Sequence, residues 1–207
     1  ITRAERNLAH MIIEEFMITA NEAVASRLEG LGVPSLYRVH EKPDTTKIEE
    51  LKPIFSSFGL KVKMSSTKVF HSILNQVKGT AEESLLNILL LRSLKQAKYA
   101  TENIGHFGLA SDCYTHFTSP IRRYPDLVVH RILKDSLGKN KLSDEMTQYL
   151  ENILPDIAVQ SSKTERTADE AEREIVSAMR AWFMKDKVGD EYTGLVMNIT
   201  AYGLKIQ

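Results

Sequence analysis

Two adjacent arginines, Arg122 and Arg123, follow a sequence that starts helices. Ser119 can cap a helix with its hydroxyl, and Pro120 suits the first helical position because its missing N–H would have no partner there. Both guanidinium groups then fall in the first turn, beside N–H groups that already carry positive partial charge. A phosphate would resolve this conflict, because it accepts hydrogen bonds from the N–H groups and a guanidinium at once. The pattern therefore indicates a phosphate site.

Other interpretations of the same residues need no ligand. The arginines can point into solvent or pair with Asp126, an arrangement that is common on helices and contributes little energy. Pro125 also disrupts a helix already under way, so residues 120–124 could form a single turn before a second helix near Pro125. That bend would help to hold Arg122 in one direction. Spacing alone leaves these alternatives open.

The distribution of charge fits an anionic ligand better than the total charge does. The formal net charge is zero, yet residues 60–140 hold twelve Lys or Arg against six Asp or Glu, and residues 142–175 hold three against nine. A basic segment beside an acidic one is compatible with one anion site, because the local field matters more than the sum. A chance distribution of surface charge explains the same counts.

Composition also bears on whether the protein spans a membrane, contains disulfides or works in a reducing compartment. No apolar run approaches the roughly 20 residues that a membrane span needs, so no membrane partner is expected. Cys113 is the single cysteine, which excludes an internal disulfide and fits a reducing, cytoplasmic setting. The chain starts at Ile1 and stops at Gln207 within a strand-like pattern. We therefore expect a fragment.

The elements that must position the arginines are mostly helical. Apolar spacing, caps and stop signals predict helices at residues 3–31, 44–58, 69–77, 81–97, 120–137 and 142–187, the last either continuous or broken at Pro155. Gly30 and Gly32 should end the first helix, Asp44 should cap the second, and Gly59 should stop it. The helix at 81–97 is apolar nearly all round and should be buried. Short strands are expected at 36–40 and within 98–118, with a turn near 103–105, and two strands within 191–207. The fold class is α+β, mostly helical, with a small antiparallel sheet.

One long motif and several shorter stretches occur in a fixed order along the chain. The motif is Tyr114-Thr-His-Phe-Thr-Ser-Pro-Ile-Arg-Arg-Tyr-Pro-Asp-Leu followed by His130-Arg131. The shorter stretches are 14–25, 37–44, 105–110, 168–174 and 183–184. Together they resemble the ribonuclease R and ribonuclease II family of exoribonucleases. The resemblance covers residues 3–187 and is closer to ribonuclease R, chiefly through 37–44 and 93–99.

The resemblance implies both an architecture and an activity. Residues 1–187 would be the C-terminal part of the exoribonuclease catalytic domain. Residues 188–207 would be the first strands of a truncated RNA-binding OB-fold, an incomplete β-barrel, as Gly194-Leu-Val and Thr200-Ala-Tyr-Gly-Leu indicate. The family hydrolyses single-stranded RNA from the 3′ end and releases nucleoside monophosphates. A monomeric parent protein is expected, although the sequence does not fix the oligomeric state.

The same resemblance assigns roles within the signature. Arg122 matches the family's arginine at the scissile phosphate, and a fixed guanidinium there would stabilise charge that grows in the transition state. His116, Ser119 and Tyr124 are expected to shape the RNA site. Packing is an equally good explanation for Tyr124.

Two glutamates outside the signature also match family positions. Glu14 resembles the glutamate that holds the 3′-terminal nucleotide. We expect it to contact ribose hydroxyls, because an acceptor for a 2′-OH is one way to prefer RNA to DNA. Glu172 resembles a glutamate near the end of the RNA path. Judged from the helical pattern alone, Glu14 is better explained as a solvated residue beside Glu15, and Glu172 as one more charge on an acidic helix.

Metal ligands are the part of the family pattern that this chain lacks. The family uses magnesium bound by closely spaced aspartates, but no aspartate here has another within two residues. The histidines show no i, i+4 pair that suggests zinc. We therefore expect no metal ligand in this chain, magnesium bound by aspartates upstream of Ile1, and no RNA cleavage by the chain alone. A non-catalytic RNA-binding or scaffold module is the alternative, and the sequence before Ile1 would discriminate the two.

Overall fold

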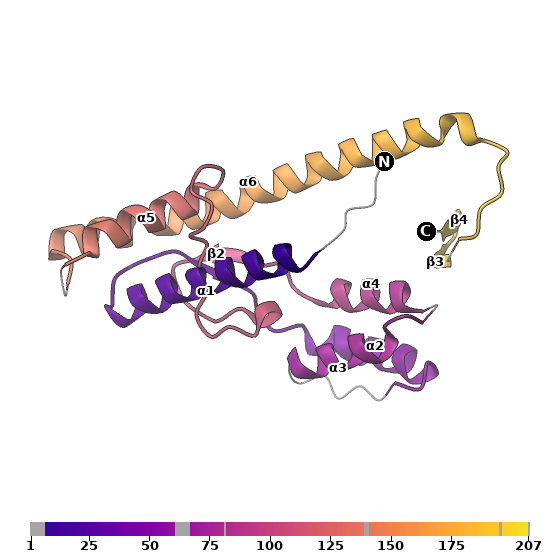
Figure 1. Ribbon diagram of the computed structural model, residues 1–207, viewed down its shortest axis with the longest axis horizontal. Coiled ribbons are helices and arrows are strands. Elements are labelled where there is room, and N and C mark those ends of the chain that lie inside the picture. The colour runs from indigo at the N-terminus through magenta and orange to yellow at the C-terminus, as the bar shows by residue number, and fades with distance from the viewer. Residues whose placement is uncertain (1–6, 61–66, 81, 139–140, 195, 207) are drawn as a thin grey trace. The chain divides into compact units, whose positions relative to one another are not determined.

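The structure is a computed structural model, and it describes residues 7–60, 67–80, 82–138, 141–194 and 196–206 (Figure 1). The chain divides into two units, each assembled from separate stretches of sequence. The first unit comprises residues 1–42 and 96–165, and the second comprises residues 43–95 and 166–207. Arg3 and Ala81, where two of the predicted helices would begin, lie outside the described residues.

The first unit begins with the helix α1 (Leu8–Gly30). Asn7 caps it reciprocally, because Asn7 Oδ1 accepts a hydrogen bond from the His10 amide and His10 Nδ1 accepts one from the Asn7 amide. The helix ends at the predicted glycines, and Gly32 has a φ of +64°, which glycine adopts at little cost. Local sequence signals therefore define both ends of this helix.

Two short strands and two more helices complete the first unit. The strands β1 (Tyr37–Val39) and β2 (Lys98–Ala100) pair antiparallel, with Arg38 opposite Tyr99. The 3-10 turn η1 (Phe107–Leu109) and the helix α5 (Tyr124–Ser136) follow, and α6 (Asp144–Met184) starts in this unit. Pro155 lies inside α6, so the predicted helix is continuous. The larger apolar cluster that these elements bury consists of Leu28, Val33, Leu36, Tyr99, Val128, Val129, Ile132, Leu142, Leu150, Leu154 and Ala158.

The second unit contains the helices α2 (Thr45–Ser57), α3 (Thr67–Val77) and α4 (Glu83–Ser93). Asp44 caps α2 as predicted, with its side chain accepting a hydrogen bond from the Thr46 amide at 2.9 Å. Gly59 follows this helix with a φ of +75°, as its predicted stop. Both α2 and α3 pack against α4.

The helix α4 differs from its prediction in length and burial. It spans Glu83–Ser93 rather than 81–97, and it buries Leu86, Leu90 and Ser93. Leu91 is 67% exposed, so the expectation of burial on all sides is wrong. The buried residues recur at helical spacing, which places them on the one face that neighbouring helices cover.

The end of the chain forms the two predicted strands. After η2 (Lys185–Lys187), β3 (Val196–Thr200) pairs antiparallel with β4 (Gly203–Ile206). The predicted α+β class, mostly helical with a small antiparallel sheet, is confirmed. The assignment of residues 188–207 to an OB-fold stays a prediction, as does the boundary at 187. No helix in the described part of the chain is both long and apolar enough to cross a membrane.

Candidate functional site

The two arginines lie on a tight turn that precedes α5. The carbonyl of Ser119 accepts hydrogen bonds from the amides of Arg122, at 3.3 Å, and Arg123, at 3.1 Å. Arg123 has extended backbone angles, and α5 begins at Tyr124. The prediction of one helix from Pro120 is therefore wrong, and the alternative of a single turn before a second helix is confirmed. A continuous helix would lack one hydrogen bond at Pro125, which has no N–H.

Arg123 has its partner within the protein. Its guanidinium donates to Asp126 Oδ1 at 2.6 Å, and Asp126 is fully buried. The carboxylate of Asp126 also lies in the first turn of α5, where a negative charge is favourable. The electrostatic conflict inferred from the sequence is therefore resolved for Arg123 by Asp126, without an external anion.

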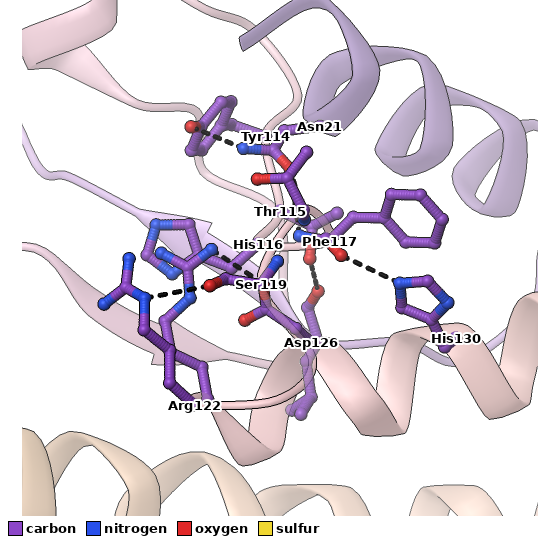
Figure 2. A network of polar contacts seen from close by, with 12 residues as sticks. Asn21, Tyr114, Thr115, His116, Phe117, Ser119, Arg122, Asp126 and His130 are labelled. Carbon is purple, nitrogen blue, oxygen red and sulfur yellow. Dashed lines mark hydrogen bonds and ion pairs between the residues drawn. The ribbon is translucent and has the colours of Figure 1, made fainter. Parts of the chain in front are cut away.

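Arg122 is different, because its side chain is exposed. Its Nε donates to Ser119 Oγ at 2.8 Å, which fixes the inner end of the guanidinium (Figure 2). Among the described residues, no carboxylate forms an ion pair with Arg122. The two terminal nitrogens extend beyond the contact with Ser119, so this side chain can donate a forked pair of hydrogen bonds to an external anion.

A buried asparagine of α1 holds the strand that leads into this turn. Asn21 Oδ1 accepts from the amides of Phe117, at 2.9 Å, and Thr118, at 3.2 Å. Its Nδ2 donates to the Tyr114 hydroxyl at 2.8 Å (Figure 2). Asn21 was not among the predicted site residues. Its only sequence signal was an amide among apolar residues on one helix face, and nothing in that signal identifies its partners.

His130 of α5 holds the same strand from another side. Its Nε2 lies 2.8 Å from the carbonyl oxygen of Phe117, and its ring stacks on the Phe117 ring at 3.9 Å (Figure 2). A carbonyl oxygen only accepts, so Nε2 carries the proton. The signature histidine at this position is therefore a packing and hydrogen-bonding residue in this structure.

His116 lies in a group of aromatic and cationic side chains. Its Nδ1 is 2.9 Å from the Tyr99 hydroxyl, and Arg38, paired with Glu165 at 2.6 Å, lies over the Tyr99 ring. Burial, followed by the charges of Arg123 and Arg38, lowers the pKa of His116 to about 3. Burial raises the pKa of Tyr99 to about 12. At neutral pH both groups are therefore uncharged, and the imidazole contributes no positive charge to an anion site.

The remaining predicted residues are distributed more widely. Glu14 is half-buried on α1, seven residues before Asn21, which corresponds to roughly 10 Å along a helix. Tyr124 is exposed at the first position of α5. Glu172 is exposed on the part of α6 that belongs to the second unit. The structure therefore brings Ser119 and Arg122 into contact, while the RNA-binding roles of all six predicted residues stay predictions.

The described side chains do not form a metal site. No group of three or more His, Cys, Asp or Glu residues in the described ranges is arranged to hold an ion. These described residues therefore do not fit a magnesium centre by themselves.

Comparison with known proteins identifies the family. Residues 1–139 match the family described as RNB domain. The chain belongs to the RNB-domain family. It is 46% identical over 207 residues to "Ribonuclease R" of Aquifex aeolicus, with 98% of this chain and 29% of that protein covered. This confirms the resemblance to the ribonuclease R and ribonuclease II family.

Solved structures of RNB-domain relatives agree with the fold. Mycoplasma genitalium RNase R in complex with ribose methylated single-stranded RNA is 30% identical, with a TM-score of 0.89 over 98% of this chain and 32% of that one. Yeast Ssd1, described as a pseudonuclease, is 27% identical, with a TM-score of 0.61 over 76% of this chain and 21% of that one. The chain thus spans less than a third of the length of these two ribonuclease R relatives.

Proposed function

We propose that this chain is part of a 3′→5′ hydrolytic exoribonuclease that releases nucleoside monophosphates from RNA. The chain would supply the phosphate-contacting part of the active site. The proposal is supported by membership of the RNB-domain family, by relatives named ribonuclease R, and by a relative with single-stranded RNA bound. A magnesium cofactor held by aspartates outside this chain, a monomeric state and a cytoplasmic location belong to the same proposal.

The observation that carries the proposal is the contrast between Arg122 and Arg123. Asp126 neutralises Arg123, whereas Arg122 is exposed and oriented by Ser119. Hydrolysis forms a bond from phosphorus to the oxygen of water and breaks the bond to the 3′ oxygen of the preceding nucleotide. Negative charge grows on the phosphoryl oxygens during this step, and a guanidinium already held in place stabilises it without reorganisation.

The other predicted residues would contact the rest of the nucleotide. Glu14 would accept a hydrogen bond from a ribose hydroxyl of the 3′-terminal nucleotide. His116 is neutral at physiological pH, because burial lowers its pKa to about 3, so any contact that it makes with RNA is a hydrogen bond or ring packing. Tyr124 and Glu172 are exposed and would lie along the RNA path.

The first test replaces Arg122 in the full-length enzyme. For Arg122→Ala, we expect the single-turnover rate of 3′ cleavage to fall by about 10²–10³-fold, the typical loss for one transition-state donor. The dissociation constant for single-stranded RNA should change much less, because the contact strengthens only as the reaction proceeds. Arg27→Ala, which removes an exposed arginine of α1, is the matched control and should leave both values near wild type. Equal losses of affinity and rate would assign Arg122 to plain binding.

A second test concerns the chain alone. Because its described residues form no metal site, the purified 207-residue chain should not shorten labelled single-stranded RNA when magnesium is added. The full-length enzyme under the same conditions is the positive control. Progressive 3′ shortening by the chain alone would contradict this part of the proposal.

A non-catalytic RNA-binding or scaffold module is the second candidate. The match to yeast Ssd1, a pseudonuclease, favours it, since a protein of related fold carries that description. The full-length protein discriminates the two functions. Binding of RNA without any release of monophosphates in magnesium would support the module and exclude the exoribonuclease.

A further inference from the structure

Three consecutive backbone amides before Arg122 donate to buried side chains. Phe117 and Thr118 donate to Asn21 Oδ1, and Ser119 donates to Asp126 Oδ1 at 2.8 Å. The two acceptors come from different helices, α1 and α5 (Figure 2). The segment 117–119 is therefore held by directional bonds from both sides.

Both acceptor side chains are buried, where a polar group costs free energy unless hydrogen bonds compensate for its lost hydration. Asn21 is 3% exposed and Asp126 is 0% exposed. Asp126 Oδ2 and Arg123 Nε have no hydrogen-bond partner among the described residues, although both atoms are buried. Well-packed apolar residues are often as stabilising as a buried ion pair, so such a pair is weak evidence for a role in stability. The need to fix the backbone of residues 117–119 in one conformation better explains why these two buried positions are polar.

Ser119 links the held segment to Arg122 through hydrogen bonds of its backbone and its side chain. Its amide is held by Asp126, its carbonyl accepts the amides of Arg122 and Arg123, and its hydroxyl accepts from Arg122 Nε. Every described contact that orients the Arg122 guanidinium therefore passes through Ser119. A displacement of residue 119 would displace the guanidinium with it.

We propose that Asn21 and Asp126 are positioning residues, which hold the amides of residues 117–119 and so set the place of the Arg122 guanidinium at the scissile phosphate. This inference rests on the proposed function. Neither residue needs to contact RNA. Their contribution is to keep a phosphate contact in its productive geometry, where a displacement of about 1 Å can cost roughly 100-fold in rate.

The test uses the full-length enzyme, single-turnover cleavage and RNA affinity. Asn21→Leu and Asp126→Leu keep comparable side-chain size but remove the acceptors, and we expect each to slow cleavage by about 10- to 100-fold with little change in RNA affinity. Asn21→Asp retains an oxygen acceptor for both amides, so its rate should recover toward wild type. Asp135→Asn, an exposed change on α5, is the matched control.

A double-variant cycle with Arg122→Ala decides between positioning and general support of the fold. If Asn21 and Asp126 act through Arg122, then adding Asn21→Leu or Asp126→Leu to Arg122→Ala should slow cleavage no further, within about twofold. Additive losses in that background would overturn the inference. The smaller changes Asn21→Ala and Asp126→Ala, which also remove the acceptors, supply the same cycle if a leucine variant does not fold.

The outcomes separate this inference from the function beneath it. A normal cleavage rate for Arg122→Ala would refute the proposed role of Arg122 itself. A slow Arg122→Ala together with normal rates for the Asn21 and Asp126 variants would refute only the positioning role. Slow Leu variants, recovery in Asn21→Asp and non-additivity with Arg122→Ala would together establish it.

Discussion

The segment 114–126 in the first unit and the helices α2–α4 in the second are held by different forces. Around the segment, buried polar groups bind backbone atoms, as Asn21, Asp126 and Thr115 do. Among the side chains of α2–α4 that the structure describes, the buried residues are hydrophobic apart from Ser93, whose hydroxyl donates to the Leu90 carbonyl of its own helix. Hydrogen bonds are directional, whereas apolar contact is not. The first region is therefore built to fix one conformation, and the second to supply stability.

The largest effect expected from this contrast is in the second unit. Phe55 of α2 is fully buried, and Phe55→Ala should lower the free energy of unfolding of this unit by about 3–5 kcal/mol, through lost transfer energy and the cavity left behind. Chemical denaturation, with amide hydrogen exchange to locate the loss, would measure it. The protection of amides in α2–α4 should fall furthest.

Phe58 provides the matched control for that change. It is 42% exposed three residues later, so Phe58→Ala should cost less than about 1 kcal/mol. Equal losses for the two variants would show that burial in α2–α4 does not determine its stability. The proposed difference between the two regions would then be wrong for α2–α4.

The contrast also explains how far the sequence could predict the structure. The caps at Asn7 and Asp44 and the stop at Gly59 depend on residues close in the chain, and of these the Asp44 cap and the Gly59 stop were predicted correctly. The start at Ser119 was misassigned because Pro125 interrupts a continuous helix. The resulting turn is then held by Asp126, seven residues after Ser119, which accepts a hydrogen bond from the Ser119 amide. Capping and stop signals therefore predict helix ends correctly where the hydrogen-bond partners are close in sequence.

The candidate site was predictable only in part, for the same reason. Arg122 was identified from its neighbours, and its exposure agrees with the phosphate interpretation. The alternative pairing with Asp126 turned out to apply to Arg123 alone. The role of Asn21 depends on amides more than ninety residues away, and no spacing within one sequence indicates such a contact.

A smaller effect, dependent on pH, should appear mainly in the first unit. Burial, followed by nearby cationic and imidazole groups, lowers the pKa of His116 to about 3 and that of His106 to about 4. In the unfolded chain both groups titrate near 6.5, so below that pH the unfolded state binds protons that the folded state does not. Stability should therefore fall as pH decreases from about 6.5 towards the folded-state values, by at most about 1.4 kcal/mol per pH unit for each histidine.

Measurement between pH 7 and pH 5 isolates these histidines from most carboxylates, which titrate lower. His116→Gln should flatten the dependence of unfolding free energy on pH, because one of the two contributing groups is gone. His10→Gln is the control, since glutamine at that position of α1 can retain the capping box. An unchanged slope in His116→Gln would mean that His116 is accessible to protons in the folded protein. The region around Arg122 would then be less tightly closed than its buried hydrogen bonds indicate.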